Sequence, residues 1–245
     1  MTSTHLGRKV GMIRRLTDAH YRALMDRCSE IRPAKARTVL TRQGEAVDES
    51  LMLTRGIMGR HVPAKDREVR QMVAIEVPGD FVDLHGFPTG ILDHDVTAIT
   101  DVEMAVFPHA AIREIVETDP DLTVALWGLT IVDAAIHRHW SFRIGALRAL
   151  SAIANFLCEL ELRLRLAGEA EEGRFRLALT QTDIAEACGM TSVHVSRMLR
   201  DLREAGLCSV EGGYVTLHDH DGLRELGRFD PHFLHLGGID GPTSG

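Results

Sequence analysis

The sequence predicts an α+β chain, in which an antiparallel, jelly-roll-like β-roll comes first and a mostly helical region follows. The first hundred residues contain short β-type runs separated by glycine and proline, a spacing typical of sandwiches and barrels. From Pro108 onward, apolar residues recur at three- and four-residue steps, which are typical of helices. We therefore expect the β-roll at residues 12–118, a long helix at 119–143, a helical domain at 144–222 and a tail at 223–245.

The composition fits an ordinary globular chain of two domains. Of its 245 residues, 44% are hydrophobic and 26% are charged, which is enough apolar sequence to bury two cores. The first sixteen residues lack the apolar stretch of a secretory signal. The most apolar run, residues 122–132, is too short to cross a bilayer. We expect a cytoplasmic protein with no membrane partner.

Charge and cysteine content reduce the range of partners and cofactors that we expect. The net charge is −7, so positive charge for a nucleic acid would have to be concentrated locally. The four cysteines, Cys28, Cys158, Cys188 and Cys208, are scattered and form no C-x-x-C pair. This spacing gives no support to a zinc ribbon or an iron–sulfur cage, and we expect the thiols to pack as small hydrophobic groups.

Glycine and proline mark the ends of the expected strands. The run "RTVLTRQGE" alternates before a glycine, "SLMLTRGIMGRHV" is divided by Gly56, and "VRQMVAIEVPGDF" runs into Pro78. Alternation of this kind indicates half-buried strands. The runs "HDVTAIT" and "VEMAVFP" are expected to pair with each other around Thr100 and Asp101.

Asp119 and Pro120 begin the longest helical pattern. Proline suits a first helical turn, and apolar residues then repeat every seven positions over about two dozen residues. A seam of this kind commonly packs against a second copy of the same helix, and a helix packed only on its own domain is the alternative. The expected dimer contacts are Leu122, Leu126, Leu129, Val132 and Ile136.

Residues 180–206 contain two short helical patterns joined by a tight turn. Thr180 stands three residues before Asp183, the spacing of a capping box, and Gly189 adopts left-handed backbone at little cost. The run "LCSVEGGYVTL" then alternates like a β-hairpin wing. Two short helices joined in this way form the helix–turn–helix motif that reads DNA. The apolar inner face of the second helix is Val195, Met198, Leu199 and Leu202.

The outer face of the second helix carries short and hydrogen-bonding side chains. Arginine can donate two parallel hydrogen bonds to guanine, and valine can contact the methyl group of thymine. The alternative is a plain helical hairpin with a solvated outer face, because Arg203 is flanked by Asp201 and Glu204. The expected base-reading residues are Ser192, Val193, Ser196 and Arg197. The expected phosphate contacts are Thr180, Gln181, Thr182, Thr191 and Arg200.

Over nearly its whole length, the chain resembles the Crp/Fnr family of bacterial transcription regulators. The likeness is carried by "LTQTDIAEACGMTSVHVSRMLRDLREAGL" in the helix–turn–helix and by "PGDFVDLHGF" and "VTAITDVEMAVFP" in the β-roll. The resemblance implies a homodimer on palindromic double-stranded DNA, an effector bound by the N-terminal domain, and RNA polymerase as a further partner. Val193 stands where several family members carry a glutamate, so we expect a different half-site.

The resemblance also implies where an effector would bind, and part of that site is missing. Members that bind a cyclic nucleotide hold its ribose with a Gly-Glu pair, for which Gly79 and Asp80 stand here, and its phosphate with an arginine. Residues 90–100 contain neither arginine nor lysine but do contain Asp93 and Asp95, which would repel a phosphate. Cyclic AMP bound in the usual family mode is therefore not expected. An iron–sulfur cluster is not expected either, because the family's N-terminal cysteine group is absent, and the effector stays unknown.

Histidines in the β-roll leave a metal-dependent alternative open. A cupin-like metalloenzyme would need two histidines and a carboxylate, for which His85, His94 and Asp95 are the candidates. The β region lacks the H-x-H element of such a barrel, and no nucleophile–base–acid arrangement stands out. We expect no metal site and no catalytic residue, and we expect residues 218–221 to form an exposed turn. A DNA-binding regulator that has lost its ligand is the other alternative.

Overall fold

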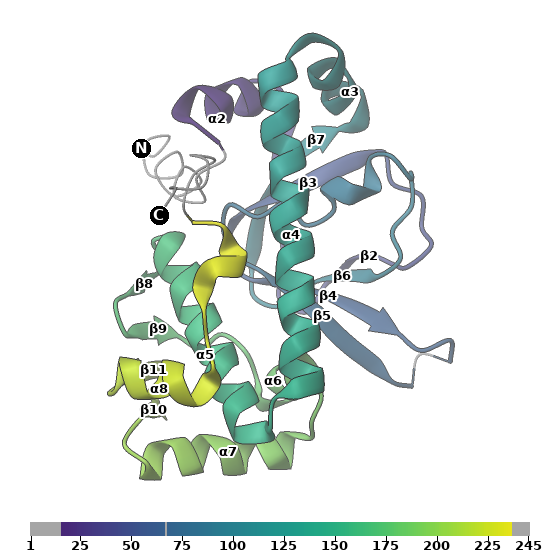
Figure 1. Cartoon of the computed structure of the whole chain (residues 1–245). Coiled ribbons are helices and arrows are strands. Elements are labelled where there is room, and N and C mark those ends of the chain that lie inside the picture. Colours follow the sequence, from purple (N-terminus) through teal and green to yellow (C-terminus); the bar gives the residue numbers. More distant parts are fainter. Residues whose placement is uncertain (1–15, 67, 237–245) are drawn as a thin grey trace.

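The computed structural model describes residues 16–66 and 68–236. A β-roll and a helical domain lie on either side of the long helix α4 (Pro120–Ala146), which runs the length of the molecule (Figure 1). The expected start of the β-roll at residue 12 and the last nine residues of the expected tail lie outside the described residues.

The β-roll consists of two antiparallel sheets, which confirms the predicted fold class. One sheet has the strand order β1-β7-β3 and the other has the order β2-β6-β4-β5. Leu53, Met58, Val96 and Met104 come from both sheets and are buried together in one core. The elements are β1 (Glu30–Ala34), β2 (Val39–Thr41), β3 (Glu49–Arg55), β4 (Met58–Pro63), β5 (Arg70–Glu76), η1 (Leu84–Gly86), β6 (Asp95–Ala98) and β7 (Val102–Pro108).

The expectation that β6 and β7 pair with each other is wrong. β6 lies between β2 and β4, whereas β7 lies between β1 and β3, so the chain passes from one sheet to the other at Thr100 and Asp101. Gly56 allows this close crossing, because a Cβ atom there would lie 2.4 Å from the carbonyl oxygen of Asp101. An alternating pattern shows which face of a strand is buried, but it does not show which strand lies beside it.

Helices α2 (Asp18–Met25) and α3 (His109–Thr118) cover one end of the β-roll, and α4 follows α3 directly. The Asp119 side chain accepts a hydrogen bond from the backbone nitrogen of Leu122 at 3.0 Å, which is the N-cap interaction that begins α4. The helix ends at Ala146 rather than at residue 143. Helix α2 was not expected from the sequence.

The inner face of α4 is buried against the chain's own domains, and this corrects the expected dimer contacts. Leu122 and Leu126 pack beside α3 and the β-roll, while Val132 and Ile136 belong to the core shared with β5 and α5. Leu129 is half-buried beside the first of these groups. These five side chains therefore hold the monomer together.

The outer face of α4 exposes a different set of apolar side chains. Val124, Trp127, Ile131 and Ala134 are all exposed, and they follow one another at alternating steps of three and four residues; we call them the exposed stripe. Trp127 retains 66% of its accessible surface. Apolar residues occur on both sides of this helix, so a seven-residue repeat can be drawn on either side. Only the packing of the neighbouring elements shows which of the two sides is buried within the chain.

The C-terminal domain surrounds α5 with short helices and a four-stranded sheet of order β10-β11-β9-β8. Its core includes the fully buried Ile153, Phe175, Val195 and Leu223. The elements are α5 (Ala149–Leu166), β8 (Ala170–Glu171), β9 (Arg174–Arg176), α6 (Gln181–Cys188), α7 (Ser192–Glu204), β10 (Cys208–Glu211), β11 (Tyr214–Leu217), α8 (His220–Gly227) and η2 (Pro231–Leu234).

The expected tail is wrong for the part that the structure describes, and residues 218–221 are largely exposed, as expected, but begin a helix instead of forming only a turn. Asp219 accepts a hydrogen bond from the backbone nitrogen of Gly222 at 2.9 Å and caps α8, so residues 218–221 lead into a helix that continues past residue 223. Helix α8 crosses α5 closely, because a Cβ atom on Gly227 would lie 2.6 Å from the backbone nitrogen of Asn155. Leu234 in η2 is also buried.

Candidate nucleic-acid interface and effector pocket

Local hydrogen bonds fix the two helices of the predicted reading motif. Thr180 and Asp183 form the expected capping box at the start of α6, each side chain bonding to the other residue's backbone nitrogen. Gly189 ends α6 in the left-handed conformation, with φ of 65° and ψ of 39°. Thr191 then caps α7 by accepting a hydrogen bond from the backbone nitrogen of His194 at 3.3 Å. The cap, turn and second cap set the angle between the helices.

Helix α7 has one buried and one exposed face, as the sequence predicts. Val195, Met198 and Leu202 are buried in the domain core, and Leu199 is partly buried against it. Val193 lies on the opposite side and is 79% exposed. A valine so open to solvent gains nothing from burial within its own chain.

The structure places the predicted DNA-contacting residues on the surface of α6 and α7. Ser192 is half-buried, and the others are exposed. Arg197 donates from Nη2 to Nε2 of His194 at 3.1 Å, which leaves its other donors free to reach outward. Arg200 and Glu204 lie 3.9 Å apart and are both exposed, so this ion pair holds Arg200 only weakly. In Figure 1, α7 lies at the end of the molecule away from α2 and α3.

The sequence did not reveal that α6 is bound to the β-roll. Arg37 donates two hydrogen bonds to the carboxylate of Asp183, at 2.7 and 2.8 Å. Arg70 in β5 bonds to Glu186 at 3.1 Å. Burial alone would raise the pKa of Asp183, but its hydrogen bonds with Arg37 and Thr180 hold that pKa below its usual value. Arg37 and Asp183 are far apart in the chain, and no local pattern links them.

A cavity lies between the β-roll, α4 and α5, at the position where the resemblance implies an effector. Gly79 and Asp80 line it, as expected, and so do Asp133 of α4, Arg163 of α5 and Leu234 of η2. Gly79 has a φ of 104°, in the region that favours glycine. The backbone therefore turns Asp80 into the space between the two domains.

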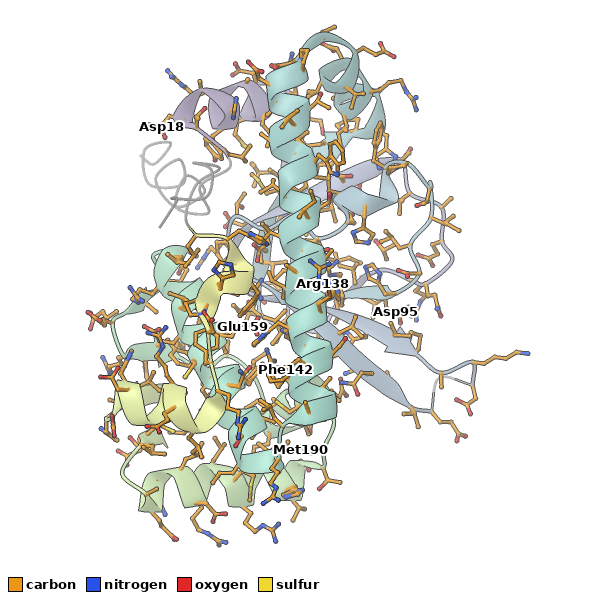
Figure 2. The ribbon with its side chains drawn as sticks, viewed as in Figure 1. Asp18, Asp95, Arg138, Phe142, Glu159 and Met190 are labelled. Atoms are coloured by element: carbon orange, nitrogen blue, oxygen red, sulfur yellow. The ribbon has the colours of Figure 1, made fainter. Side chains whose placement is uncertain are left out.

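Asp80 is engaged in a buried network of charges. Arg163 donates to Asp80 at 2.8 Å and to Glu159 at 3.2 Å. Arg60 forms an ion pair with Glu76 at 2.6 Å and is only 2% exposed. We call the whole set the ionic junction: Arg60, Glu76, Asp80, Asp133, Arg143, Glu159 and Arg163. Figure 2 labels Glu159 between α4 and α5.

The ionic junction does not fit a cyclic phosphate held in the usual way. Arg163 lines the cavity and is paired with Asp80 and Glu159. Arg60 does not line it and is paired with two carboxylates that do, those of Glu76 and Asp133. Burial raises the pKa of Glu76 to about 8, which shows how costly this carboxylate is to charge in its surroundings. An added phosphate would have to displace Asp80 or Glu159 from Arg163.

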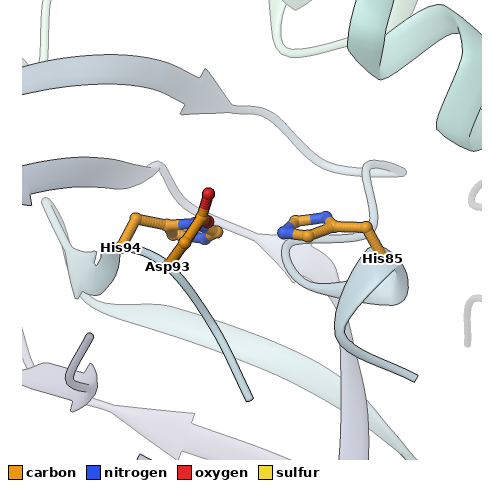
Figure 3. A group of neighbouring side chains, drawn as sticks. All are labelled: His85, Asp93 and His94. Carbon is orange, nitrogen blue, oxygen red and sulfur yellow. The ribbon is translucent and has the colours of Figure 1, made fainter. Parts of the chain in front are cut away.

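A cluster of metal-ligating side chains lies next to this cavity. His85 and His94, the two histidines of the metal-dependent alternative, come together, but the nearby carboxylate is that of Asp93 rather than Asp95 (Figure 3). Asp95 instead accepts a hydrogen bond from the backbone nitrogen of Gln43 at 2.8 Å. Burial lowers the pKa of His85 to about 4. This histidine cluster, His85, Asp93 and His94, is the one group of three metal-ligating side chains among the described residues.

Three of the four cysteines, Cys158, Cys188 and Cys208, are buried in the structure. In the part of the chain that the structure describes, none of the four belongs to a group of three ligating side chains. Burial raises the pKa of Cys158 and Cys188 to about 12 and that of Cys208 to about 11. The three thiols are therefore protonated and unsuited to bind a metal as thiolates.

Comparisons with known proteins agree with this architecture. The family described as the Crp-like helix-turn-helix domain matches residues 151–226. The transcriptional activator protein FnrL of Cereibacter sphaeroides is 28% identical over 198 residues, which cover 80% of this chain and 79% of FnrL. The transcriptional activator protein Anr of Pseudomonas aeruginosa is 26% identical over 199 residues, covering 80% and 81%. The structure of FixK2 from Bradyrhizobium japonicum superposes with a TM-score of 0.74 at 21% identity, covering 80% of this chain and 96% of FixK2.

The fold and the exposed face of α7 define a DNA-binding transcription regulator of the winged helix–turn–helix class, with β10 and β11 as the wing. The structural likeness to FixK2 covers 80% of this chain, so it extends beyond residues 151–226 into the β-roll and α4. The matches together support a transcription regulator of the Crp/Fnr type. Among the described residues, no helix combines the length and the apolar character needed to cross a membrane.

Proposed function

We propose that the chain acts in the cytoplasm as a homodimer that binds a palindromic DNA site through its two α7 helices. The observation that carries this proposal is the division of α7 into a buried inner face and an outer face whose valine is 79% exposed. An apolar side chain at the first turn of a capped helix suits contact with a base edge in the major groove. The two α7 helices would sit about 34 Å apart, in successive major grooves.

Each outer-face residue has a role that follows from its chemistry. Arg197 reads a guanine through two parallel hydrogen bonds, Val193 contacts a thymine methyl group, and Ser192 and Ser196 allow the helix to approach the bases. The phosphates are held by side chains at the starts of α6 and α7 and by one arginine. These residues are Thr180, Gln181, Thr182, Thr191 and Arg200.

The exposed stripe of α4 is the dimer contact in this proposal. Its steps of three and four residues match the seam of a two-stranded coiled coil, and Trp127 offers the largest apolar side chain on that face. Arg138 is exposed one step further along the helix, and Figure 2 labels it on the lower half of α4. The dimer therefore uses the face opposite to Leu122 and Ile136.

The cavity between the β-roll, α4 and α5 is where an input would act on DNA binding. A ligand that binds one arrangement of the ionic junction better than another would shift the population of the dimer towards that arrangement. Because α6 is bonded to the β-roll through Arg37 and Arg70, such a shift would also move the reading helices. RNA polymerase is the further partner that the resemblance implies, and no catalytic activity is proposed.

The direct test is selection of genomic fragments on the purified, ligand-free protein, followed by sequencing and repeated at moderate salt. We expect a shared inverted repeat that survives the added salt, because base contacts depend less on salt than phosphate contacts do. Retention of such fragments by the ligand-free protein would favour a regulator that binds DNA without a ligand over one that an effector switches. Retention that is weak, salt-sensitive and without a shared sequence would contradict specific DNA reading by the ligand-free protein.

A further inference from the structure

The histidine cluster stands outside the DNA-binding and dimer surfaces. His85 lies in η1, and Asp93 and His94 precede β6, so a single loop region brings the three together. One ligating atom from each residue lies within 4.8 Å of the other two. The imidazole centroids of His85 and His94 are 5.2 Å apart, and Figure 3 shows the two rings facing each other, with the Asp93 carboxylate beside His94.

His94 has an unsatisfied polar atom at this position. Its side chain is 5% exposed, and its Nδ1 lies 2.7 Å from the carboxylate of Asp93. Its other ring nitrogen, Nε2, is buried and has no hydrogen-bond partner among the described residues. Buried polar atoms in native proteins almost always have a partner, and this nitrogen, beside a second imidazole, is available to accept one.

We propose that His85, Asp93 and His94 form a binding site for a divalent transition-metal ion. Imidazole nitrogen suits zinc, iron, nickel and copper, and a set of two histidines and one carboxylate leaves further coordination positions open. Magnesium and calcium prefer oxygen ligands alone. Both nitrogen ligands therefore select a transition metal.

The ligating atoms already lie near the separation that one ion requires. Nitrogen and oxygen ligands bind zinc at roughly 2.0–2.2 Å, so two ligands of one ion lie at most about 4.4 Å apart. The three atoms here lie within 4.8 Å of one another, so a small movement suffices. Asp93 can supply this movement, because its side chain is 91% exposed. The charge of Arg60, the nearby cation, is offset by its ion pair with Asp133, whose pKa, despite burial, Arg60 helps to hold below its usual value.

The site borders the cavity beneath α4. His85 lines that cavity together with Asp133 of α4, and His137 lies one turn further along the same helix. A metal ion on His85 would therefore place positive charge beside Asp133, which is paired with Arg60 in the ionic junction. Metal binding would then bias α4 and, through it, DNA affinity. This coupling rests on the proposed function, whereas the metal site itself does not.

The test is titration of the full, metal-free chain with Co2+ by visible absorption and with Zn2+ by equilibrium dialysis. We expect one tightly bound ion per chain and at least a tenfold loss of affinity in His85→Ala and in His94→Ala. Asp93→Asn changes an exposed side chain and should fold normally, so it tests the site even if a histidine variant does not fold. The double variant His218→Ala/His220→Ala removes a pair of histidines in the C-terminal domain, one exposed and one half-buried, and should bind like the unchanged chain.

Two results would overturn the site. One is the absence of a tightly bound ion on the unchanged chain. The other is affinity that persists in His94→Ala and Asp93→Asn but disappears in the His218→Ala/His220→Ala control, which would mean an adventitious ion only.

The coupling has its own readout. Zn2+ should change the DNA affinity of the unchanged chain and leave that of His85→Ala unaltered. If the metal binds but DNA affinity stays the same, the coupling is wrong and the site stands. If no specific DNA binding occurs with or without Zn2+, the proposed function fails while the metal titration remains valid.

Discussion

The outer face of α7 and the ionic junction both depend on charged side chains, but they use them in opposite surroundings. Arg197 and Arg200 are exposed, with weak or single contacts, so each is free to meet an outside partner. Arg60 and Arg163 are buried and bind carboxylates of their own chain. A buried charge without its partner is costly, whereas an exposed one is not. The comparison shows that α7 can change its target at little cost to folding, while the ionic junction cannot change without affecting the fold.

The largest effect is expected in the ionic junction. Glu159→Gln removes the charge that Arg143, Arg163 and Trp140 all contact, so two buried arginines lose an anionic partner. We expect the free energy of unfolding to fall by about 3–5 kcal/mol, measured by chemical denaturation. Glu204→Gln on the exposed side of α7 is the matched control and should change it by less than about 0.5 kcal/mol. If both variants lower the free energy of unfolding by the same small amount, the ionic junction is no more sensitive to the loss of a charge than the exposed side of α7.

Substitutions in the exposed stripe of α4 should weaken dimer association, unlike substitutions on the outer face of α7 or in the ionic junction. Trp127→Ala removes the largest side chain of the exposed stripe, and each copy in a dimer would lose it. We expect dimer association to weaken by about 2 kcal/mol or more, measured by analytical ultracentrifugation, with the monomer still folded. Val116→Ala, at an exposed valine of α3, should leave association unchanged. If Trp127→Ala leaves dimer association unchanged, the dimer contact lies elsewhere on the chain.

Arg197→Ala should separate binding from folding. Loss of a bidentate contact to guanine should reduce specific DNA affinity by roughly 1–3 kcal/mol, measured by fluorescence anisotropy, and relax the preference at one base position. Stability should stay within about 0.5 kcal/mol of the original, because the side chain is exposed. Arg22→Ala removes the same charge on α2, away from α7 (Figure 1), and should not alter the preferred sequence. Unchanged selectivity in Arg197→Ala would contradict the assigned face.

Gly189 lies where the reading helix meets the end of α4. Its substitution by alanine should give the smallest of these effects. Gly189→Ala puts a side chain on backbone with a φ of 65° and brings its Cβ atom to 3.1 Å from Ile144. We expect a loss of about 1–2 kcal/mol in stability. Gly145→Ala is the control, because this position is helical and has nothing within 4 Å. That variant should be neutral or stabilised by up to about 1 kcal/mol.

Features set by neighbouring residues in the chain were predictable. The capping box of Thr180 and Asp183, the turn at Gly189 and the buried face of α7 all follow from residues a few positions apart, and the structure confirms them. The alternating runs likewise predicted an antiparallel β-roll. For the DNA contacts, the sequence and the structure together establish exposure on one side of the motif, and the contacts themselves stay predictions.

Features set by distant residues were not predictable. The carboxylate beside His85 and His94 is Asp93, because Asp95 turns away to bond Gln43, and strand alternation does not show where a loop carboxylate points. The bond between Arg37 and Asp183 joins positions 146 residues apart. Arg163 reaches the cavity between the β-roll, α4 and α5 from a helix outside the region in which the family resemblance implies a phosphate arginine.

The sequence by itself determined the strands of the β-roll, the long helix, and the caps and side-chain chemistry of the reading motif, because these depend on periodicity and on contacts within one or two turns. It did not reveal α2, α8 or η2. The tertiary structure decided which strands pair, which face of α4 is buried and how the charges of the ionic junction are matched. Those outcomes depend on packing among elements that the chain brings together from far apart. For α4 in particular, both faces are apolar, and only the neighbouring elements decide which face is covered and which one remains as the exposed stripe.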